Sequence, residues 1–190
     1  MGALRIVIAA ILLAAAVPAQ AQSVERWRPY IDEASARFGV PAEWIERVMQ
    51  AESSGRTRLG GRPTTSSAGA MGLMQLMPGT WSAMRARLGL GSDPHAPRDN
   101  ILAGTLYLRL MHDRFGYPGL FGAYNAGPGR YASYLAGRAS LPGETRDYLA
   151  AVAGPGWSKS TRRARMPRET NGAEPAVQAN GPATIFFIRR

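Results

Sequence analysis

The residue with the clearest chemical potential in this sequence is Glu52. It stands at the next helical position, i+7, after the apolar residues Ile45, Val48 and Met49 at i, i+3 and i+4. A carboxylate on such a stripe is partly buried, and the negative end of a helix dipole lies beside it. Both effects raise the pKa of a carboxyl group. A carboxylic acid that keeps its proton near neutral pH can act as a general acid, so Glu52 is a candidate for that role.

A helix over residues 40–53 must position this carboxyl group. Pro41 suits its first turn, where a backbone N–H has no partner within the helix, and a Ser-Ser-Gly stop ends the pattern. Taken by itself, this helix also fits a second interpretation. A single acidic residue on an apolar stripe commonly turns to solvent or pairs with a nearby arginine, here Arg56 or Arg58.

Apolar residues recur at helical spacing along most of the chain, and no run alternates apolar and polar residues over a useful length. This pattern predicts a mostly α fold with one domain over residues 22–157. Thr80 is a candidate N-cap, and residues 55–65 are expected to form a loop made flexible by Gly60 and Gly61. Besides 40–53, helices are expected over residues 24–38, 80–88, 101–115, 120–125, 131–135 and 141–152.

A second polar candidate, Gln75, lies in a segment that is otherwise apolar. Leu73 and Met74 precede it and Leu76 follows it. A buried amide is costly unless it has hydrogen-bond partners, and facing a polar ligand in a cleft would supply them. The methionines of this region are flexible enough to fill irregular gaps in a core, which is the role expected for Met77 and Met84.

The two ends of the chain differ from its middle. Arg5 precedes an apolar run over residues 6–17, and Ala19-Gln20-Ala21 has the small-x-small pattern of a cleavage site. Residues 1–21 are therefore predicted to be a secretory signal peptide that leaves no stable membrane span once removed. An uncleaved anchor is the weaker alternative, because the run is short for a bilayer.

The C-terminal residues 158–190 are rich in Pro, Gly, Arg, Asn and Glu, and predict a basic, disordered tail. Within it, the apolar segment over 184–188 either contacts a partner, packs back on the domain or stays unstructured. The chain carries a formal net charge of +10, half of it from Lys159 onward.

Such a positive field concentrates anionic partners: cell-wall polymer, a membrane surface or nucleic acid. We expect no nucleic-acid partner, because an exported protein rarely meets one and the basic residues are not interleaved with aromatic residues. An ordinary solvated basic surface accounts for most of the charge. The chain has no cysteine, and His95 and His112 lie apart without the spacing of metal ligands. We therefore expect no disulfide, no metal and no organic cofactor.

Four blocks of sequence, in this order, resemble one family. They are E-S-S-G over 52–55, S-S-A-G-A-M-G-L-M-Q-L-M-P-G-T-W over 66–81, A-Y-N-A-G-P-G over 123–129 and L-P-G-E-T-R-D-Y over 141–148. The segment D-N-I-L-A-G over 99–104 and Tyr107-Leu108 agree with them. Together they resemble the transglycosylase SLT domain of soluble-type lytic transglycosylases, which is similar in fold to goose-type lysozyme. The resemblance implies a single lysozyme-like helical domain with a catalytic cleft.

The resemblance also implies a substrate and a reaction. The family cleaves the β-1,4 bond between N-acetylmuramic acid and N-acetylglucosamine in peptidoglycan without water, and leaves a 1,6-anhydromuramoyl end; it is a carbon–oxygen lyase. Glu52 stands where the family has its single catalytic acid/base. Ordinary glycosidases use two carboxylates, and no second one accompanies Glu52 in the matching blocks. Groups of the substrate would take the place of the second carboxylate. The N-acetyl carbonyl would stabilise the developing positive charge, and the C6 hydroxyl would act as an internal nucleophile.

Several further residues match family positions that contact the glycan. Tyr124 would position the catalytic carboxyl or the N-acetyl group, and Asn125 would hold the cleft or bind the N-acetyl group. Gln75 and the backbone around Gly72 would line the cleft, and Met74 would contact the sugar rings.

Four other matching residues have supporting roles in this interpretation. Ser53 and Ser66 would either brace the loop beside Glu52 or contact the substrate, while Glu144 and Tyr148 would support the floor of the site. The complete set of implied substrate-binding residues is Ser53, Ser66, Gly72, Leu73, Met74, Gln75, Ala123, Tyr124, Asn125, Glu144 and Tyr148.

The sequence departs from the family between Glu52 and Ser66. This stretch is longer than the usual spacing by about five residues, a length that surface loops tolerate at small entropic cost. It also lacks the usual Asn-Pro pair. Because the loop borders the cleft in the family, the subsite contacts there are open.

The interpretation is therefore an exported, periplasmic lytic transglycosylase that binds peptidoglycan strands. Two other classes stay open: a lysozyme-like hydrolase that uses Glu52 with water, and a module that binds glycan without cutting it. A small enzyme with a basic tail also suits local wall opening for a secretion or conjugation machine, with the tail from Lys159 to Arg190 as the contact.

Overall fold

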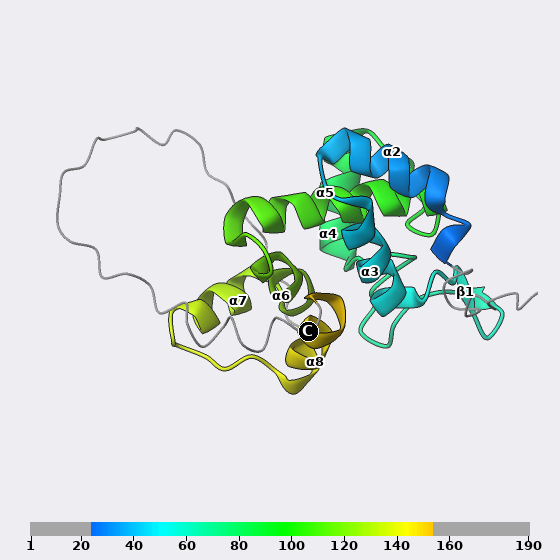
Figure 1. Ribbon diagram of the computed structural model, residues 1–190. Helices are drawn as coiled ribbons and strands as arrows, with labels where there is room; N and C mark the ends of the chain where they lie inside the picture. Colours follow the sequence, from blue (N-terminus) through cyan, green and yellow to red (C-terminus); the bar gives the residue numbers. More distant parts are fainter. Residues whose placement is uncertain (1–23, 154–190) are drawn as a thin grey trace, which may run out of the picture.

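The computed structural model describes residues 24–153 and contains, over that range, seven α-helices and one short β-hairpin (Figure 1). The predicted signal peptide and the predicted C-terminal tail lie outside the described residues. The mostly helical fold is confirmed. In chain order the elements are α2 (Arg28–Phe38), α3 (Ala42–Ser53), β1 (Arg58–Leu59), β2 (Arg62–Pro63), α4 (Pro78–Leu88), α5 (Pro97–Phe115), α6 (Gly119–Ala126), α7 (Pro128–Leu135) and α8 (Gly143–Ala153).

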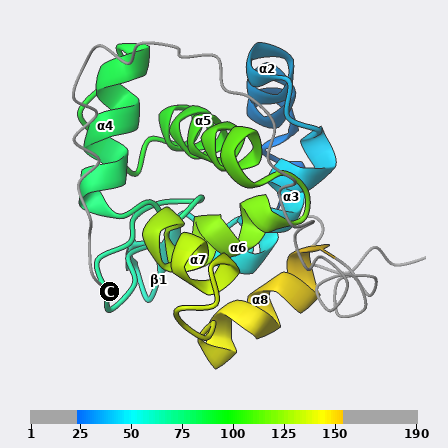
Figure 2. The ribbon, with the colours of Figure 1, turned by 90° about the vertical axis from the view of Figure 1, so that its left-hand side faces the viewer.

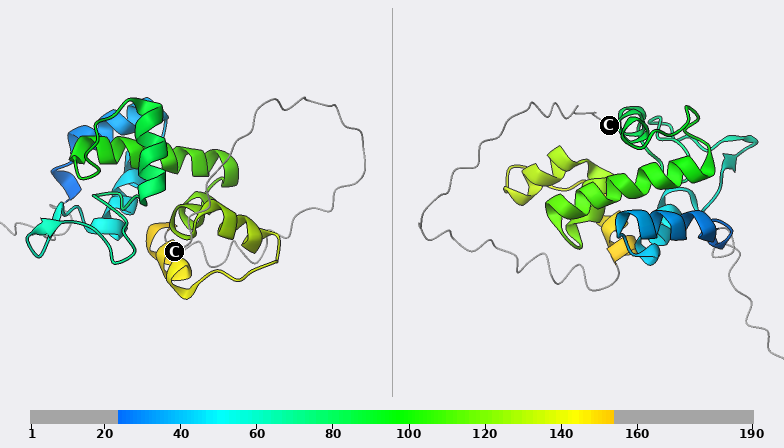
Figure 3. Two further views of the ribbon diagram at one scale, coloured as in Figure 1. Left: turned by 180° about the vertical axis from the view of Figure 1, so that it is seen from behind. Right: turned by 90° about the horizontal axis from the view of Figure 1, so that it is seen from above.

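Helix α5 is the centre of the packing. It contacts α2, α4 and α6, and α6 in turn contacts α7 and α8. Figure 2 shows α5 between α4 and α2, with α6, α7 and α8 beneath it, and the view from above in Figure 3 shows α5 running alongside α2. The inward side chains of α5 are fully buried, among them Ile101, Leu102 and Leu108. Burial of this apolar surface is the main force that holds the helices together.

Helix α3 forms as its apolar stripe predicts. Ile45, Val48 and Met49 are fully buried, where α3 packs against α2 and α8. The helix ends at Ser54, which adopts the left-handed conformation with φ 53°. A non-glycine residue in this conformation is uncommon, and here it turns the chain sharply just after Glu52.

The starts of helices α4 and α5 differ from the sequence prediction. Helix α4 begins at Pro78 and has no side-chain cap hydrogen bond, so the predicted N-cap role of Thr80 is wrong. Helix α5 begins at Pro97, before the predicted start at Ile101. Both helices begin with a proline because its fixed φ suits a first turn and its missing N–H needs no partner there.

The expected flexible loop over residues 55–65 contains a β-hairpin. Strands β1 and β2 pair in antiparallel register, with Leu59 opposite Arg62. Gly60 and Gly61 form the turn, with φ 56° and 78°; two positive φ values are what a tight two-residue hairpin turn requires, and glycine adopts them without strain. The expectation of an irregular loop is therefore corrected.

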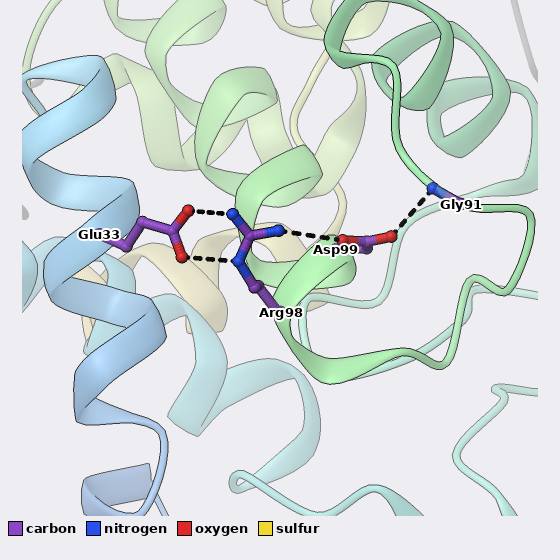
Figure 4. A network of polar contacts seen from close by, with 4 residues as sticks. All are labelled: Glu33, Gly91, Arg98 and Asp99. Atoms are coloured by element: carbon purple, nitrogen blue, oxygen red, sulfur yellow. Dashed lines mark hydrogen bonds and ion pairs between the residues drawn. The ribbon is translucent and has the colours of Figure 1, made fainter.

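A surface network joins α2 to the start of α5. The guanidinium of Arg98 donates to both carboxylate oxygens of Glu33 and lies 3.7 Å from a carboxylate oxygen of Asp99. The other oxygen of Asp99 accepts a hydrogen bond from the Gly91 backbone N–H at 3.0 Å. Figure 4 shows the four residues in a line. Arg98 is exposed, so solvent screens this network and it orients the segments more than it stabilises them.

Within residues 24–153, no helix combines the length and the apolar character needed to cross a membrane.

The packing generates a stability prediction. Ile31→Ala removes a fully buried side chain from the contact between α2 and α5, and we expect it to lower the free energy of unfolding by about 2–5 kcal/mol. Arg98→Gln, which breaks the exposed network between the same two helices, should leave the urea midpoint nearly unchanged. Equal losses in the two variants, measured by urea denaturation, would contradict an apolar origin for this contact.

Candidate active site

Glu52 lies in the last turn of α3, at the wall of a pocket of about 200 Å³. Its side chain continues the buried stripe of the helix but is itself only half-buried. Arg56 and Leu59 enter the same wall from the segment that follows α3. The described residues that line the pocket are Glu52, Ser53, Arg56, Leu59, Thr64, Thr65, Ser66 and Gln75. Glu52 is the one acidic residue among them.

Ser53 ties the end of α3 to the segment on the opposite side of the pocket. Its buried hydroxyl donates to the Leu73 carbonyl at 2.8 Å and accepts from the Gly55 backbone N–H at 3.2 Å. The hydroxyl is also 3.3 Å from the Met49 carbonyl, one turn back. These hydrogen bonds support the bracing alternative for Ser53.

The turn after Glu52 has a second anchor, from the start of the described chain. The Gly55 carbonyl accepts hydrogen bonds from the Arg26 guanidinium at 2.6 Å and from the Trp27 indole N–H at 2.9 Å. Trp27 falls within the helix expected over residues 24–38, and the sequence alone indicates no partner for its indole N–H. The hydrogen bond of the indole became visible only once these two distant segments were brought together.

Asn100, on α5, holds the segment that carries Gln75. Its side-chain oxygen accepts from the Met74 backbone N–H at 2.7 Å. Its amide nitrogen donates to the carbonyls of Met71 at 3.1 Å and Pro94 at 2.8 Å. The side chain of Asn100 is fully buried, so each of these hydrogen bonds is made away from water, where losing one is costly. Asn100 lies in the matching segment over 99–104, where the sequence alone indicates no function for its side chain.

The close approach of this segment to α5 depends on two glycines. A Cβ at Gly72 would lie 2.4 Å from the Asn100 side-chain nitrogen, and a Cβ at Gly104 would lie 2.5 Å from the Met74 Cβ. Real Cβ atoms do not approach other atoms this closely, so both positions require glycine.

The structure corrects the expectation that Met74 contacts the sugar rings. The Met74 side chain has no exposed surface, because it packs against Gly104 in the core. Leu73 and Ala123 are likewise buried, so their side chains cannot contact a sugar in this conformation. What Met74 offers is its backbone, whose carbonyl accepts from the Tyr124 hydroxyl at 2.7 Å.

Gln75 lies in the pocket wall with a left-handed backbone, φ 46°. Its side-chain nitrogen donates to the Gly72 carbonyl at 2.8 Å, so its amide does not depend on a ligand for that hydrogen bond, which corrects the argument from sequence. A non-glycine residue with positive φ carries a conformational cost, and such strain often marks a functional segment.

Ser66 closes the turn on the same side of the pocket. Its hydroxyl accepts from the Ala70 backbone N–H at 3.0 Å, and the backbones of the two residues are joined by a second hydrogen bond of 2.9 Å. Ser66 is exposed to the pocket, so it is free to take both predicted roles, bracing and substrate contact.

The remaining predicted residues lie on α6 and α8, outside the described lining of the Glu52 pocket. Asn125 is buried, and its side-chain oxygen accepts from the Thr145 hydroxyl at 2.9 Å. Glu144 is exposed and Tyr148 is half-buried beside the core. Tyr124 reaches the pocket segment through its hydrogen bond to Met74, so the structure links α6 and α8 to the site without placing them in its wall.

Neither histidine lies in a candidate metal centre. Over the described range, no three His, Cys, Asp or Glu side chains gather as metal ligands do. The His112 ring packs at 5.5 Å from the Trp44 ring, and His95 lies in the loop before α5, where its backbone N–H donates to Asp93.

The chain is similar in sequence to known proteins. Residues 29–145 match the family model of the transglycosylase SLT domain. The chain is 41% identical over 91 residues to the transglycosylase of Enterobacteria phage PRD1, covering 48% of this chain and 31% of that protein. It is 35% identical over 131 residues to the soluble lytic murein transglycosylase of Escherichia coli K12, covering 60% of this chain and 20% of that protein.

The fold has matches among solved structures as well. An inactive mutant of the lytic transglycosylase Slt from Pseudomonas aeruginosa superposes with a TM-score of 0.58 at 30% identity. The match covers 66% of this chain and 22% of that one. The chain thus spans between about a fifth and a third of the length of these relatives.

The role of Asn100 generates a prediction. Asn100→Ala leaves the Met74 N–H and the Pro94 carbonyl without the partner that Asn100 supplies, while the Met71 carbonyl keeps its hydrogen bond from the Leu76 N–H. The substitution also opens a small cavity, so we expect a loss of about 3 kcal/mol in the free energy of unfolding. Faster hydrogen exchange at the Met74 amide should accompany that loss.

Thr105→Val on the same helix is the matched control. The Thr105 hydroxyl is buried with no hydrogen-bond partner among the described residues, so its removal should leave stability unchanged or raise it by up to about 1 kcal/mol. Unchanged protection of the Met74 amide in Asn100→Ala would show that Asn100 does not hold this segment.

Proposed function

The chain belongs to the transglycosylase SLT domain family, and from this membership we propose that it is a peptidoglycan lytic transglycosylase. It cleaves the β-1,4 bond between N-acetylmuramic acid and N-acetylglucosamine and leaves a 1,6-anhydromuramoyl end. Peptidoglycan lies outside the cytoplasmic membrane, so export to the periplasm is part of the proposal. The family and the activities of the relatives support it.

The observation that carries the proposal is the place of Glu52. Its carboxyl group is half-buried at the wall of a pocket, and no other described lining residue is acidic. A glycosidase that follows the usual two-carboxylate scheme would need a second acidic residue facing the same bond. A pocket with a single carboxyl group instead favours a reaction in which the substrate supplies its own nucleophile.

The proposed reaction has two proton transfers, both at Glu52. First, the carboxylic acid protonates the glycosidic oxygen as the bond from C1 of the muramoyl ring to that oxygen breaks. The N-acetyl carbonyl stabilises the positive charge that develops at C1. Then the muramoyl C6 hydroxyl attacks C1, and the Glu52 carboxylate removes its proton, which restores the acid. The nucleophile belongs to the substrate, so proximity replaces a bound water.

The surrounding residues have proposed supporting roles. Gln75 and Ser66 lie in the pocket wall and would contact the glycan. The Ser53 hydroxyl braces the end of α3 through its hydrogen bond to the Leu73 carbonyl. Tyr124 and Asn125 would keep the cleft geometry through their hydrogen bonds to the Met74 backbone and to Thr145. A site held this tightly before substrate arrives needs little rearrangement during the reaction.

A role in local wall opening for a secretion or conjugation machine stays a prediction. It rests on the basic residues from Lys159 onward, which lie outside the described residues. Deletion of residues 159–190 with unchanged localisation and partner binding would remove its support.

Product analysis tests the proposed reaction. Glu52→Gln keeps the shape of the side chain but cannot cycle a proton, so release of muropeptides from purified cell wall should fall by about 10²–10⁴-fold. By mass spectrometry, the wild-type products should be lighter than hydrolytic products by the mass of one water. Glu43→Gln is the matched control, because Glu43 lies on the same helix and forms an exposed ion pair with Arg47.

The other outcomes separate the alternatives. Products with ordinary reducing ends would mean a lysozyme-like hydrolase. Retention of cell wall without soluble product, by wild type and Glu52→Gln alike, would mean a glycan-binding module. Equal losses in Glu52→Gln and Glu43→Gln would show that helix α3, rather than the Glu52 carboxyl group, was disturbed.

A further inference from the structure

A second pocket adjoins the Glu52 pocket on the side of the β-hairpin. It has a volume of about 470 Å³, and its described lining residues are Leu59, Arg62, Pro63, Thr65 and His95. Leu59 and Thr65 line both pockets. This hairpin pocket is therefore continuous with the wall of the candidate active site, and no role in the proposed reaction has been given to it.

The side chains around the hairpin pocket favour an anion. Arg62 lines the hairpin pocket and Arg56 lines the neighbouring Glu52 pocket, and both side chains are positively charged. Of the described residues that line the hairpin pocket, none is acidic. Leu59 adds an apolar surface that is 59% exposed. A guanidinium beside an exposed apolar side chain suits a ligand that carries a carboxylate on an aliphatic chain.

The hairpin fixes the backbone of Arg62 and the face on which its side chain lies. Arg62 pairs directly with Leu59 across the two strands, so the two side chains lie on one face of the hairpin. The base of the hairpin is closed by hydrogen bonds from Thr64, whose N–H donates to the Thr57 carbonyl at 3.0 Å and whose hydroxyl donates to the Arg56 carbonyl at 2.8 Å. The backbone of the hairpin is therefore preorganised, which lowers the part of the entropic cost of binding that comes from ordering the loop.

We propose that the hairpin pocket binds a carboxylate of the peptide stem on the muramoyl residue whose bond is cleaved. This rests on the proposed function. The stem is attached through the lactyl group at C3 of the ring whose C1 accepts the attack. The peptide stem therefore branches from the same sugar ring that is bound beside the Glu52 carboxyl group. A pocket that adjoins the Glu52 pocket is placed to receive this stem. Arg62 pairs with the carboxylate, and Leu59 contacts the aliphatic part of the stem.

Two hairpin arginines allow a matched test. Arg62 and Arg58 lie on adjacent strands and have equal charge, but Arg58 is outside the described lining of both pockets and its side chain donates to the Gly61 carbonyl at 3.2 Å. The full-length Arg62→Gln and Arg58→Gln proteins are compared on glycan strands that carry peptide stems and on strands from which the stems have been removed.

Arg62→Gln should lower kcat/KM on stem-bearing strands by about fivefold to tenfold relative to stem-free strands, the factor that one partly exposed charge-assisted hydrogen bond contributes. Arg58→Gln should show no such difference between the substrates. Equal losses from the two variants would mean a general effect of positive charge and would overturn the proposal. A loss from Arg62→Gln of the same size on both substrates would overturn it too, because Arg62 would then contact the glycan or support the fold.

A binding measurement separates this proposal from the proposed reaction. In the Glu52→Gln background, where no bond is cleaved, the Kd of a soluble disaccharide-peptide is measured by calorimetry with and without Arg62→Gln. A weaker Kd with Arg62→Gln, absent for the same disaccharide without its peptide, supports the stem site even if the wild type releases no anhydro product. An unchanged Kd overturns the stem site even if the wild type proves to be a transglycosylase.

Discussion

The three hydrogen bonds of the Asn100 side chain are the interaction on which the candidate site depends. They join α5, the helix at the centre of the fold, to the backbone of Met71, Met74 and Pro94. Once that backbone is held, its other carbonyls become available as fixed acceptors for Ser53, from α3, and for Tyr124, from α6. The buried amide of Asn100 therefore connects the core to the pocket. The elements around the pocket are positioned relative to the backbone that this amide holds.

In and around the segment that carries Gln75, some motif residues act through close backbone packing and others through side chains in the pocket wall. The motif residues Gly72 and Met74 supply close packing and backbone hydrogen bonds, while Gln75 and Ser66 lie in the pocket wall. A buried backbone segment held by several hydrogen bonds resists displacement, because opening it breaks these hydrogen bonds together. The carboxyl group of Glu52 thus faces a wall that is already in place, which is the condition for a site to act without large rearrangement.

The β-hairpin shows how the loop between Glu52 and Ser66 can vary in length without disturbing the core. The segment between Glu52 and Ser66 is closed at its base by the backbone hydrogen bond from Thr64 to Thr57, so additional residues beyond that point do not strain α3. A loop inserted between fixed ends costs little conformational entropy and lies next to the substrate. The loop between Glu52 and Ser66, where the sequence was expected to depart from its family, is for that reason a place where contacts can be added without disturbing the core.

The sequence by itself indicated the mostly helical fold, because apolar residues recur at helical spacing along much of the chain, and it singled out Glu52, because a carboxyl group interrupted such a stripe. It could not determine the partners of buried polar groups. Trp27 fell within an expected helix, Asn100 fell just before one in a matching segment that gave its side chain no role, and Met74 was expected to contact the sugar rings. Only the tertiary structure decided that the Trp27 indole donates to Gly55 and that Met74 is covered by Gly104. These outcomes depend on contacts between segments far apart in the chain, which local periodicity does not encode.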